Sequence, residues 1–183
     1  MSRVQFATEL VAILVQQGSI AANLAPDLVR QFQDDSKAEF DEFLRSAGLV
    51  TKAQLLAALS AYYRVPAFDV EGYLFDHELL INFPKDVLLN QAFIPLQIED
   101  NLLAVVASVP SDDLIEKIGE YVPYVIELRV GLQRAIIDAI EEFYDASLTN
   151  IADLNDDDEA DLYQDDLGVE EVELLDEEDD VRL

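Results

Sequence analysis

The chain has 183 residues, of which 39 are acidic and 11 basic, and its formal net charge is −28. This balance argues against direct binding to nucleic acid or to anionic membranes, because both attract basic side chains. The lack of cysteine excludes disulfides, thiolate metal sites and thiol nucleophiles. No apolar run approaches the roughly 20 residues that span a bilayer, so we expect a cytoplasmic protein without membrane insertion.

The first 64 residues predict a lobe of helical hairpins. Apolar residues recur at three- and four-residue spacing over 4–17, which predicts the first helix. Pro26 is typical of the first turn of a second helix, because its missing N–H costs nothing there. On that helix we expect Val29 and Phe32 to be buried.

Two further helices are predicted by their capping residues. Ser36 with Glu39, and Thr51 with Gln54, each have the capping-box pattern, in which two side chains satisfy two backbone N–H groups. Pro66 forces extended backbone on the residue before it and so ends the last of these helices. We therefore assign the helical lobe to residues 1–64.

The next segment, 65–146, predicts a small three-stranded sheet packed with helices. The runs 93–98 and 102–107 are rich in strand formers, and the three polar residues between them predict a hairpin. Pro95 should place its strand at an edge or at a strand start, because it cannot donate to a ladder. A third strand is expected over 124–130.

Helices are predicted between and after these strands. Asp76 and Ser111 are suited to cap helices, and Pro84 to begin one. The clearest helix covers 132–143, where apolar residues recur at helical spacing over three turns. Together with the strands, these elements predict an α+β fold.

Residues 147–183 predict a disordered acidic tail, since they hold 16 acidic residues and one basic residue. The pattern Asp153, Asn155, Asp157 imitates the first ligands of a calcium loop, but the glycine and the closing glutamate of that loop are missing. We therefore expect no metal site. The tail either solubilises the protein or binds a basic groove with its mixed acidic and apolar residues.

The order of elements from 55 to 144 resembles the N-terminal domain of type II secretion and type IV pilus assembly ATPases, the GspE, PilB and MshE family. The matching segments are Val65-Pro66 with Asp69, Asp76-His-Glu-Leu-Leu80, Phe83-Pro84, Ile94-Pro95-Leu96, the strand at 102–107, and Ile140-Glu-Glu-Phe-Tyr144. In part, Ala107-Ser-Val-Pro110 matches the family's Ala-Asp-Pro. The resemblance implies a domain that docks an ATPase onto a membrane platform. No Gly-x-x-x-x-Gly-Lys-Ser/Thr phosphate loop is present, so we expect a stand-alone recognition domain without the ATPase domain.

In MshE-type members of that family, two tandem copies of a motif bind cyclic di-GMP. A weak internal repeat here matches the apolar skeleton of those copies. The first copy retains Leu14, Gly18 and Ile20, and the second retains Leu44, Gly48, Leu49, Val50, Leu55 and Leu59.

The ligand-facing positions of the motif differ. Where the family has Arg and Gly, the first copy has Glu9 and Val11 and the second has Glu39 and Asp41, while Tyr62 replaces the closing Gln. A carboxylate in place of arginine reverses the sign of the interaction with phosphate. This pattern therefore argues against cyclic di-GMP binding, and we expect no cofactor.

The leading hypothesis is a non-enzymatic adaptor domain that binds a protein, and the family resemblance implies that this partner is a component of a secretion or pilus machine. The single histidine, His77, has no nucleophile assignable to it from the sequence, which favours a capping or surface role. One alternative is a degenerate cyclic di-GMP sensor. Another is an acidic decoy that binds basic proteins through its tail.

Overall fold

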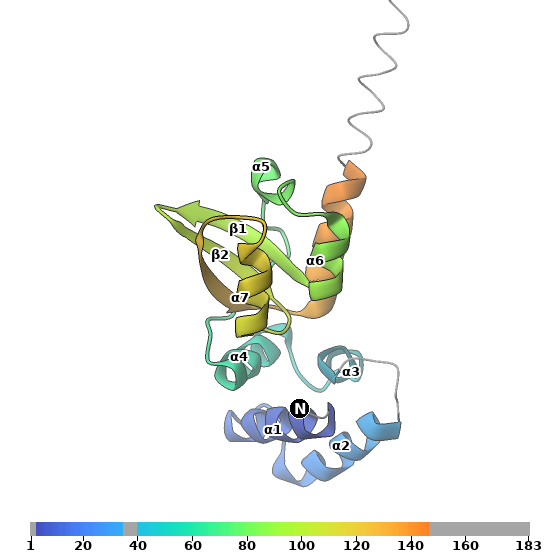
Figure 1. Cartoon of the computed structure of the whole chain (residues 1–183). Helices are drawn as coiled ribbons and strands as arrows, with labels where there is room; N and C mark the ends of the chain where they lie inside the picture. The colour runs from blue at the N-terminus through green and yellow to red at the C-terminus, as the bar shows by residue number, and fades with distance from the viewer. Residues whose placement is uncertain (1–2, 35–39, 147–183) are drawn as a thin grey trace, which may run out of the picture. The chain divides into compact units, whose positions relative to one another are not determined.

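The computed structural model describes residues 3–34 and 40–146. Along the chain, short helices lie before, between and after the strands of a three-stranded sheet (Figure 1). Residues 1–140 form one compact unit. Its elements are α1 (Arg3–Gln16), the 3-10 turn η1 (Ala22–Leu24), α2 (Ala25–Asp34), α3 (Phe40–Ser46), α4 (Lys52–Tyr63), α5 (His77–Leu80), α6 (Lys85–Gln91), β1 (Phe93–Glu99), β2 (Leu102–Ala107), α7 (Asp112–Gly119) and β3 (Val125–Val130). A last helix begins at residue 133. The predicted α+β fold is confirmed, and the predicted tail, 147–183, lies outside the described residues.

The same kind of turn follows α1 and α3. Gly18 and Gly48 have φ angles of +73° and +68°, in the left-handed region where a side chain would be strained. In each turn the residue after the glycine donates its N–H to a carbonyl of the preceding helix: Ser19 to Leu14 at 2.9 Å and Leu49 to Leu44 at 3.3 Å. The two stretches of the internal repeat therefore share one helix-ending geometry.

The capping box predicted for α4 is present. The Thr51 hydroxyl accepts the Gln54 N–H at 3.2 Å, and the Gln54 side chain accepts the Thr51 N–H at 2.9 Å. The helix ends at Arg64, whose backbone is left-handed with φ +59° and whose N–H is donated to the Ser60 carbonyl at 2.9 Å. The capping box of Ser36 and Glu39 lies outside the described residues.

Lys52 ties the start of α4 to the extended segment after Pro66. Its ammonium group lies 3.1 Å from the Asp69 carboxylate and also binds the carboxylate of Glu71. The hydrogen bond to Glu71 and then that to Asp69 raise the pKa of Lys52 above its ordinary value. The lysine therefore stays charged at neutral pH and holds the two segments together.

The sheet is mixed, with the order β1-β2-β3. β1 and β2 form the predicted antiparallel hairpin, and Asp100 at its tip has a left-handed φ of +56°. β2 and β3 are parallel, and parallel neighbours need a crossover connection, which α7 supplies. In the view of Figure 1, α7 lies in front of the sheet.

Pro95 lies on an edge strand, as predicted, and next to an irregularity of the ladder. The pairing of β1 with β2 shifts register between Pro95 and Gln97, so one residue of β1 is extra. That residue, Leu96, accepts a hydrogen bond from the Tyr73 hydroxyl at 3.3 Å through its carbonyl. The bulge thus anchors the loop that precedes α5.

The core gathers apolar side chains from both sides of the sheet. Its largest fully buried members include Phe83, Phe93, Leu10, Leu14, Leu44, Leu55, Leu80, Leu88, Ile94 and Leu103. One prediction about α2 is wrong in part: Phe32 is buried, but Val29 is only half-buried and Leu28 is buried instead. The helix turns Leu28 and Phe32, four residues apart, toward the same side. Within 3–34 and 40–146, no helix is both long and apolar enough to cross a bilayer.

The chain divides into two units after residue 140, and of the second unit the structure describes residues 141–146. These six residues are helical. The rings of Phe143 and Tyr144 meet edge to face, with centroids 5.2 Å apart.

Candidate functional site

Helices α1 and α4 pack against each other (Figure 1). A groove lies between α1 and the end of α4. It has a volume of about 600 Å³ and is open to solvent. Its lining residues are Glu9, Ala12, Ile13, Ala61, Tyr62, Tyr63 and Arg64. Three of these side chains are small or aliphatic, two are tyrosines, one is acidic and one is basic.

Tyr62 and Tyr63 line this groove, and the ring of Phe6 lies against both of them. The ring of Phe6 on α1 meets that of Tyr62 edge to face, with centroids 4.9 Å apart. Tyr62 meets Tyr63 in the same way at 4.8 Å, and Phe6 lies 6.2 Å from Tyr63. Edge-to-face ring pairs contribute stabilising free energy beyond that of their buried area. We call Phe6, Tyr62 and Tyr63 the aromatic cluster.

Glu9 supplies the negative charge of the groove. Its carboxylate accepts a hydrogen bond from the Gln5 side chain at 3.3 Å. Burial raises the pKa of Tyr62 above its ordinary value, and the charge of Glu9 raises it further. The groove therefore combines a carboxylate with a phenol that it keeps protonated, an arrangement suited to a cation.

The effect of Glu9 on Tyr62 can be measured. We expect Glu9→Gln to lower the pKa of Tyr62, because the amide carries no charge. Tyrosinate absorbance would be followed against pH, and the signal of Tyr62 obtained as the difference from a Tyr62→Phe variant. Because folding favours the protonated phenol, the free energy of unfolding should fall as the pH rises above about 10, and should fall less in Tyr62→Phe. An unchanged pKa of Tyr62 in the Glu9→Gln variant would contradict the electrostatic interaction between Glu9 and Tyr62.

The skeleton residues of the two motif copies lie mostly in the core. Those that are buried are Leu14, Ile20, Leu44, Val50, Leu55 and Leu59, while Leu49 is half-buried and Gly18 and Gly48 form the turns. Core burial explains why these positions are apolar without any ligand.

The replaced positions of the motif fall into two groups. Glu9 and Tyr62, from different copies, line the same groove. Val11 is buried in the core. Glu39 lies outside the described residues, and of Asp41 only the backbone is described. The two substitutions that the structure brings together are therefore a carboxylate and an aromatic ring.

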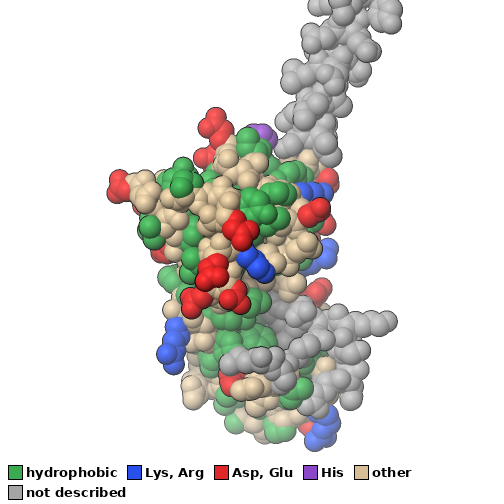
Figure 2. All heavy atoms as spheres, in the orientation of Figure 1, with side chains coloured by type: hydrophobic (Ala, Val, Ile, Leu, Met, Phe, Trp, Pro, Cys, Tyr) green, Lys and Arg blue, Asp and Glu red, His purple; other side chains and the backbone are tan. Residues whose placement is uncertain are grey.

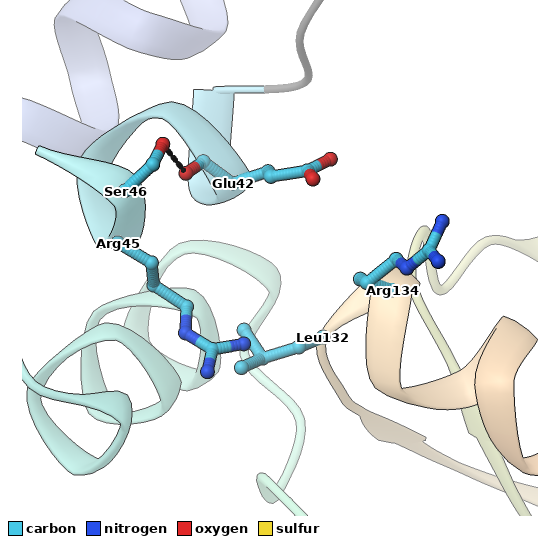
Figure 3. A pocket seen from close by; sticks show the side chains of 5 residues that line it. All are labelled: Glu42, Arg45, Ser46, Leu132 and Arg134. Atoms are coloured by element: carbon cyan, nitrogen blue, oxygen red, sulfur yellow. Dashed lines mark hydrogen bonds between the residues drawn. The ribbon is translucent and has the colours of Figure 1, made fainter.

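A second pocket lies between α3 and the start of the last helix (Figure 3). Its volume is about 280 Å³, and Glu42, Arg45, Ser46, Leu132 and Arg134 line it. The guanidinium of Arg45 lies beside Leu132, whereas Arg134 points away and bonds to Asp138 at 3.1 Å. The Ser46 hydroxyl donates to the carbonyl of Glu42 at 2.6 Å, so it is held within its own helix rather than directed at a substrate.

Other chemical candidates do not assemble in the described part of the chain. His77 is exposed at the first position of α5. No group of three His, Cys, Asp or Glu side chains among residues 3–34 and 40–146 could hold a metal ion. The calcium-like pattern at 153–157 lies outside those residues.

The described fold places helices before, between and after the strands of a mixed three-stranded sheet, and part of the chain matches a known domain family. Residues 63–150 match the sequence model of one such family, the MshEN domain. This match confirms the predicted resemblance for the sheet and its helices. The matched segment begins at the end of α4, so the two glycine turns lie before it.

Two solved structures have a similar fold. One is described as MshE with cdg, at a TM-score of 0.58 and 19% sequence identity, over 74% of this chain and 98% of that chain. The other is the N-terminal domain of XpsE, at a TM-score of 0.51 and 22% identity, over 73% of this chain and 92% of that chain. A search of curated proteins gave no match. At these identities the likeness shows the fold.

Sequence reasoning missed part of the groove. The family motif marks Glu9 and Tyr62 as substitutions, but it does not mark Tyr63 and Arg64, which line the groove, or Phe6, which lies beside it. The available signal was the pair of adjacent tyrosines at the end of an otherwise aliphatic helix face. Adjacent residues point in different directions on a helix, so a second tyrosine there cannot serve the same buried face.

Proposed function

We propose that this protein is a non-enzymatic adaptor domain that binds a protein component of a secretion or pilus machine through the groove between α1 and α4. The observation that carries the proposal is the meeting of Glu9 with the aromatic cluster in that groove. The MshEN match supports the link to secretion and pilus machinery. In this proposal the protein acts in the cytoplasm.

The chemistry of the groove favours a basic protein surface. A lysine or arginine over an aromatic face gains about 0.5–2 kcal/mol, and a carboxylate beside it adds a charge partner. The net charge of −28 attracts basic partners over distance and speeds their association. Arg64 lines the same groove and would bind an acidic group of the partner, which would fix the orientation of the partner in the groove.

The tail has a supporting role in this proposal. Residues 147–183 carry a net charge of −15, which suits an electrostatic tether for the same basic partner. The division into a helical lobe, 1–64, and an α/β lobe, 65–146, assigns docking to the first of these.

The test is affinity capture from the native host with four proteins: the full chain, residues 1–150, and the full chain with Glu9→Lys or Glu116→Lys. Both substitutions change the charge equally, but Glu116 lies on α7, away from the groove. We expect the full chain, residues 1–150 and Glu116→Lys to capture secretion or pilus components. We expect Glu9→Lys to lose them.

Two results would contradict the proposal. Equal loss in both charge variants would mean that net charge, rather than the groove, governs binding. Capture of only basic nucleic-acid proteins, lost on removal of the tail, would favour the acidic decoy instead. Such binding would also weaken steeply between low and physiological salt.

A cyclic di-GMP sensor is the second candidate, because the MshE structure of similar fold contains cdg, cyclic di-GMP. Glu9 opposes phosphate at the groove, so we expect no heat when cyclic di-GMP is titrated into the protein up to high micromolar concentration. Binding in that range, lost in Tyr62→Ala, would favour the sensor over the adaptor.

A further inference from the structure

One edge of β3 faces away from β2, and the rest of the described chain covers this outer edge only at Val130, the last residue of the strand. The strand pairs with β2 on one side only. On that side the odd-numbered residues bond to β2, as in the hydrogen bond of 3.0 Å from the Val125 N–H to the Asn101 carbonyl. Because backbone groups alternate along a strand, Ile126, Leu128 and Val130 turn their N–H and C=O groups outward.

Pro66 stops the chain from covering this edge further. Val130 exchanges two hydrogen bonds of 2.9 Å with the segment 66–68, which runs parallel to β3. In the same register, the carbonyl of Leu128 would need a donor from Pro66, whose nitrogen carries no hydrogen. The N–H of Leu128 would need the carbonyl of Arg64, which is the left-handed residue that ends α4.

The outward groups of Ile126 and Leu128 therefore have no hydrogen-bond partner among residues 3–34 and 40–146. Both side chains are half-buried, and Val125 beside them is 59% exposed. The strand contains no proline or bulge, two of the devices that protect natural sheet edges. It is thus a template for an added strand.

We propose that this edge of β3 accepts an extended segment of a partner protein in which aliphatic and basic residues alternate. Side chains of neighbouring strands pair on each face of a sheet. Aliphatic residues of the partner would lie beside Ile126 and Leu128 on one face. On the other face its basic residues would lie beside Glu127, whose side chain is 39% exposed.

The charges around β3 favour this occupant over a second copy of the chain. Arg129 is engaged within the protein, with its guanidinium 4.0 Å from Glu127 and 5.7 Å from the centre of the Phe68 ring. Carboxylates gather over α7 and at the β1–β2 hairpin tip, which adjoins the start of β3 (Figure 2). Two copies of a chain with net charge −28 repel each other, whereas a basic strand is attracted.

The test is amide hydrogen exchange of the full chain with a synthetic peptide, acetyl-Thr-Val-Lys-Val-Lys-Val-Thr-amide. In the free protein the amides of Ile126 and Leu128 should exchange faster than those of the odd-numbered residues of β3, which bond to β2. Peptide at about nine times its Kd should slow exchange at Ile126 and Leu128 by about tenfold. Concentration-dependent protection without peptide would mean that a second copy fills the edge, and would overturn the proposal.

Matched peptides and variants test strand addition itself. Two versions of the peptide carry N-methyl groups either on the valines or on the lysines, which blocks opposite sides of its backbone. An added strand presents one side of its backbone to β3, so one methylated peptide should protect the amides of Ile126 and Leu128 and the other should not. Protection by both peptides, or by neither, would refute the proposal. Ile126→Pro removes both the isoleucine side chain and the backbone N–H that points outward. Ile126→Ala removes the same side chain but keeps that N–H. Both variants lose the side-chain contact, so Ile126→Pro should weaken peptide binding more than Ile126→Ala does, and equal binding to both would contradict strand addition.

Discussion

Phe93→Ala is expected to lower the free energy of unfolding by about 3–5 kcal/mol. Phe93 is fully buried at the start of β1, and its ring meets that of Phe83 edge to face with centroids 5.5 Å apart. Truncation removes the transfer free energy of a whole ring and leaves a cavity that a close-packed core cannot fill. Chemical denaturation followed by circular dichroism measures the change.

The control for this prediction is an exposed apolar residue. Leu74 is 93% exposed, so Leu74→Ala should change the free energy of unfolding by less than about 0.5 kcal/mol. A double-mutant cycle with Phe83→Ala should give a coupling of about 0.5–1.5 kcal/mol from the ring contact. Additive effects of the two substitutions would mean that the rings do not interact as described.

Gly131→Ala is expected to cost about 1–3 kcal/mol, the usual effect of overpacking. A Cβ at this position would lie 2.5 Å from Cγ1 of Val106, and 3.3 Å from both Ile136 Cδ1 and the Phe68 carbonyl oxygen. Val106 is fully buried and β-branched, so it has no free rotamer to which it could move. The thermal midpoint should therefore fall by several degrees.

Gly119→Ala is the matched control for Gly131→Ala. Gly119 ends α7, and a Cβ there would meet nothing within 4 Å. Because alanine restricts the unfolded chain more than glycine does, the substitution should be neutral or stabilising by about 0.4–1 kcal/mol. Equal destabilisation by the two substitutions would contradict the close packing assigned to Gly131.

Local features of the fold could be predicted from the sequence because they depend on near neighbours. The capping box of Thr51 and Gln54, the glycine turns and the hairpin each involve residues within a few positions of one another. The parallel pairing of β2 with β3 could not be predicted, since periodicity indicates which face a residue occupies and not which strand lies beside it. Burial of Leu28 instead of Val29 shows the same limit within one helix.

The candidate site was predictable in its parts but not in its assembly. Glu9 and Tyr62 were each recognised as departures from a motif of the resembled family. Their meeting in one groove depends on how α1 packs against α4, which is a tertiary contact between residues far apart in the chain. The open edge of β3 depends likewise on where the segment after Pro66 happens to pair.

The pairing of Ala67 with Val130 closes a loop that contains the whole sheet. Closing it costs more chain entropy than closing the β1–β2 hairpin, because that cost grows with loop length. We therefore expect the hairpin to form early in folding and this closure to form late. Two backbone hydrogen bonds join this pair at the end of β3, so the same contact should be among the first of the sheet to open in the native state. Each opening would release the backbone N–H and C=O of Val130 and so lengthen the free edge of β3 by one residue. The edge would then alternate between a shorter and a longer form while the rest of the sheet stays folded.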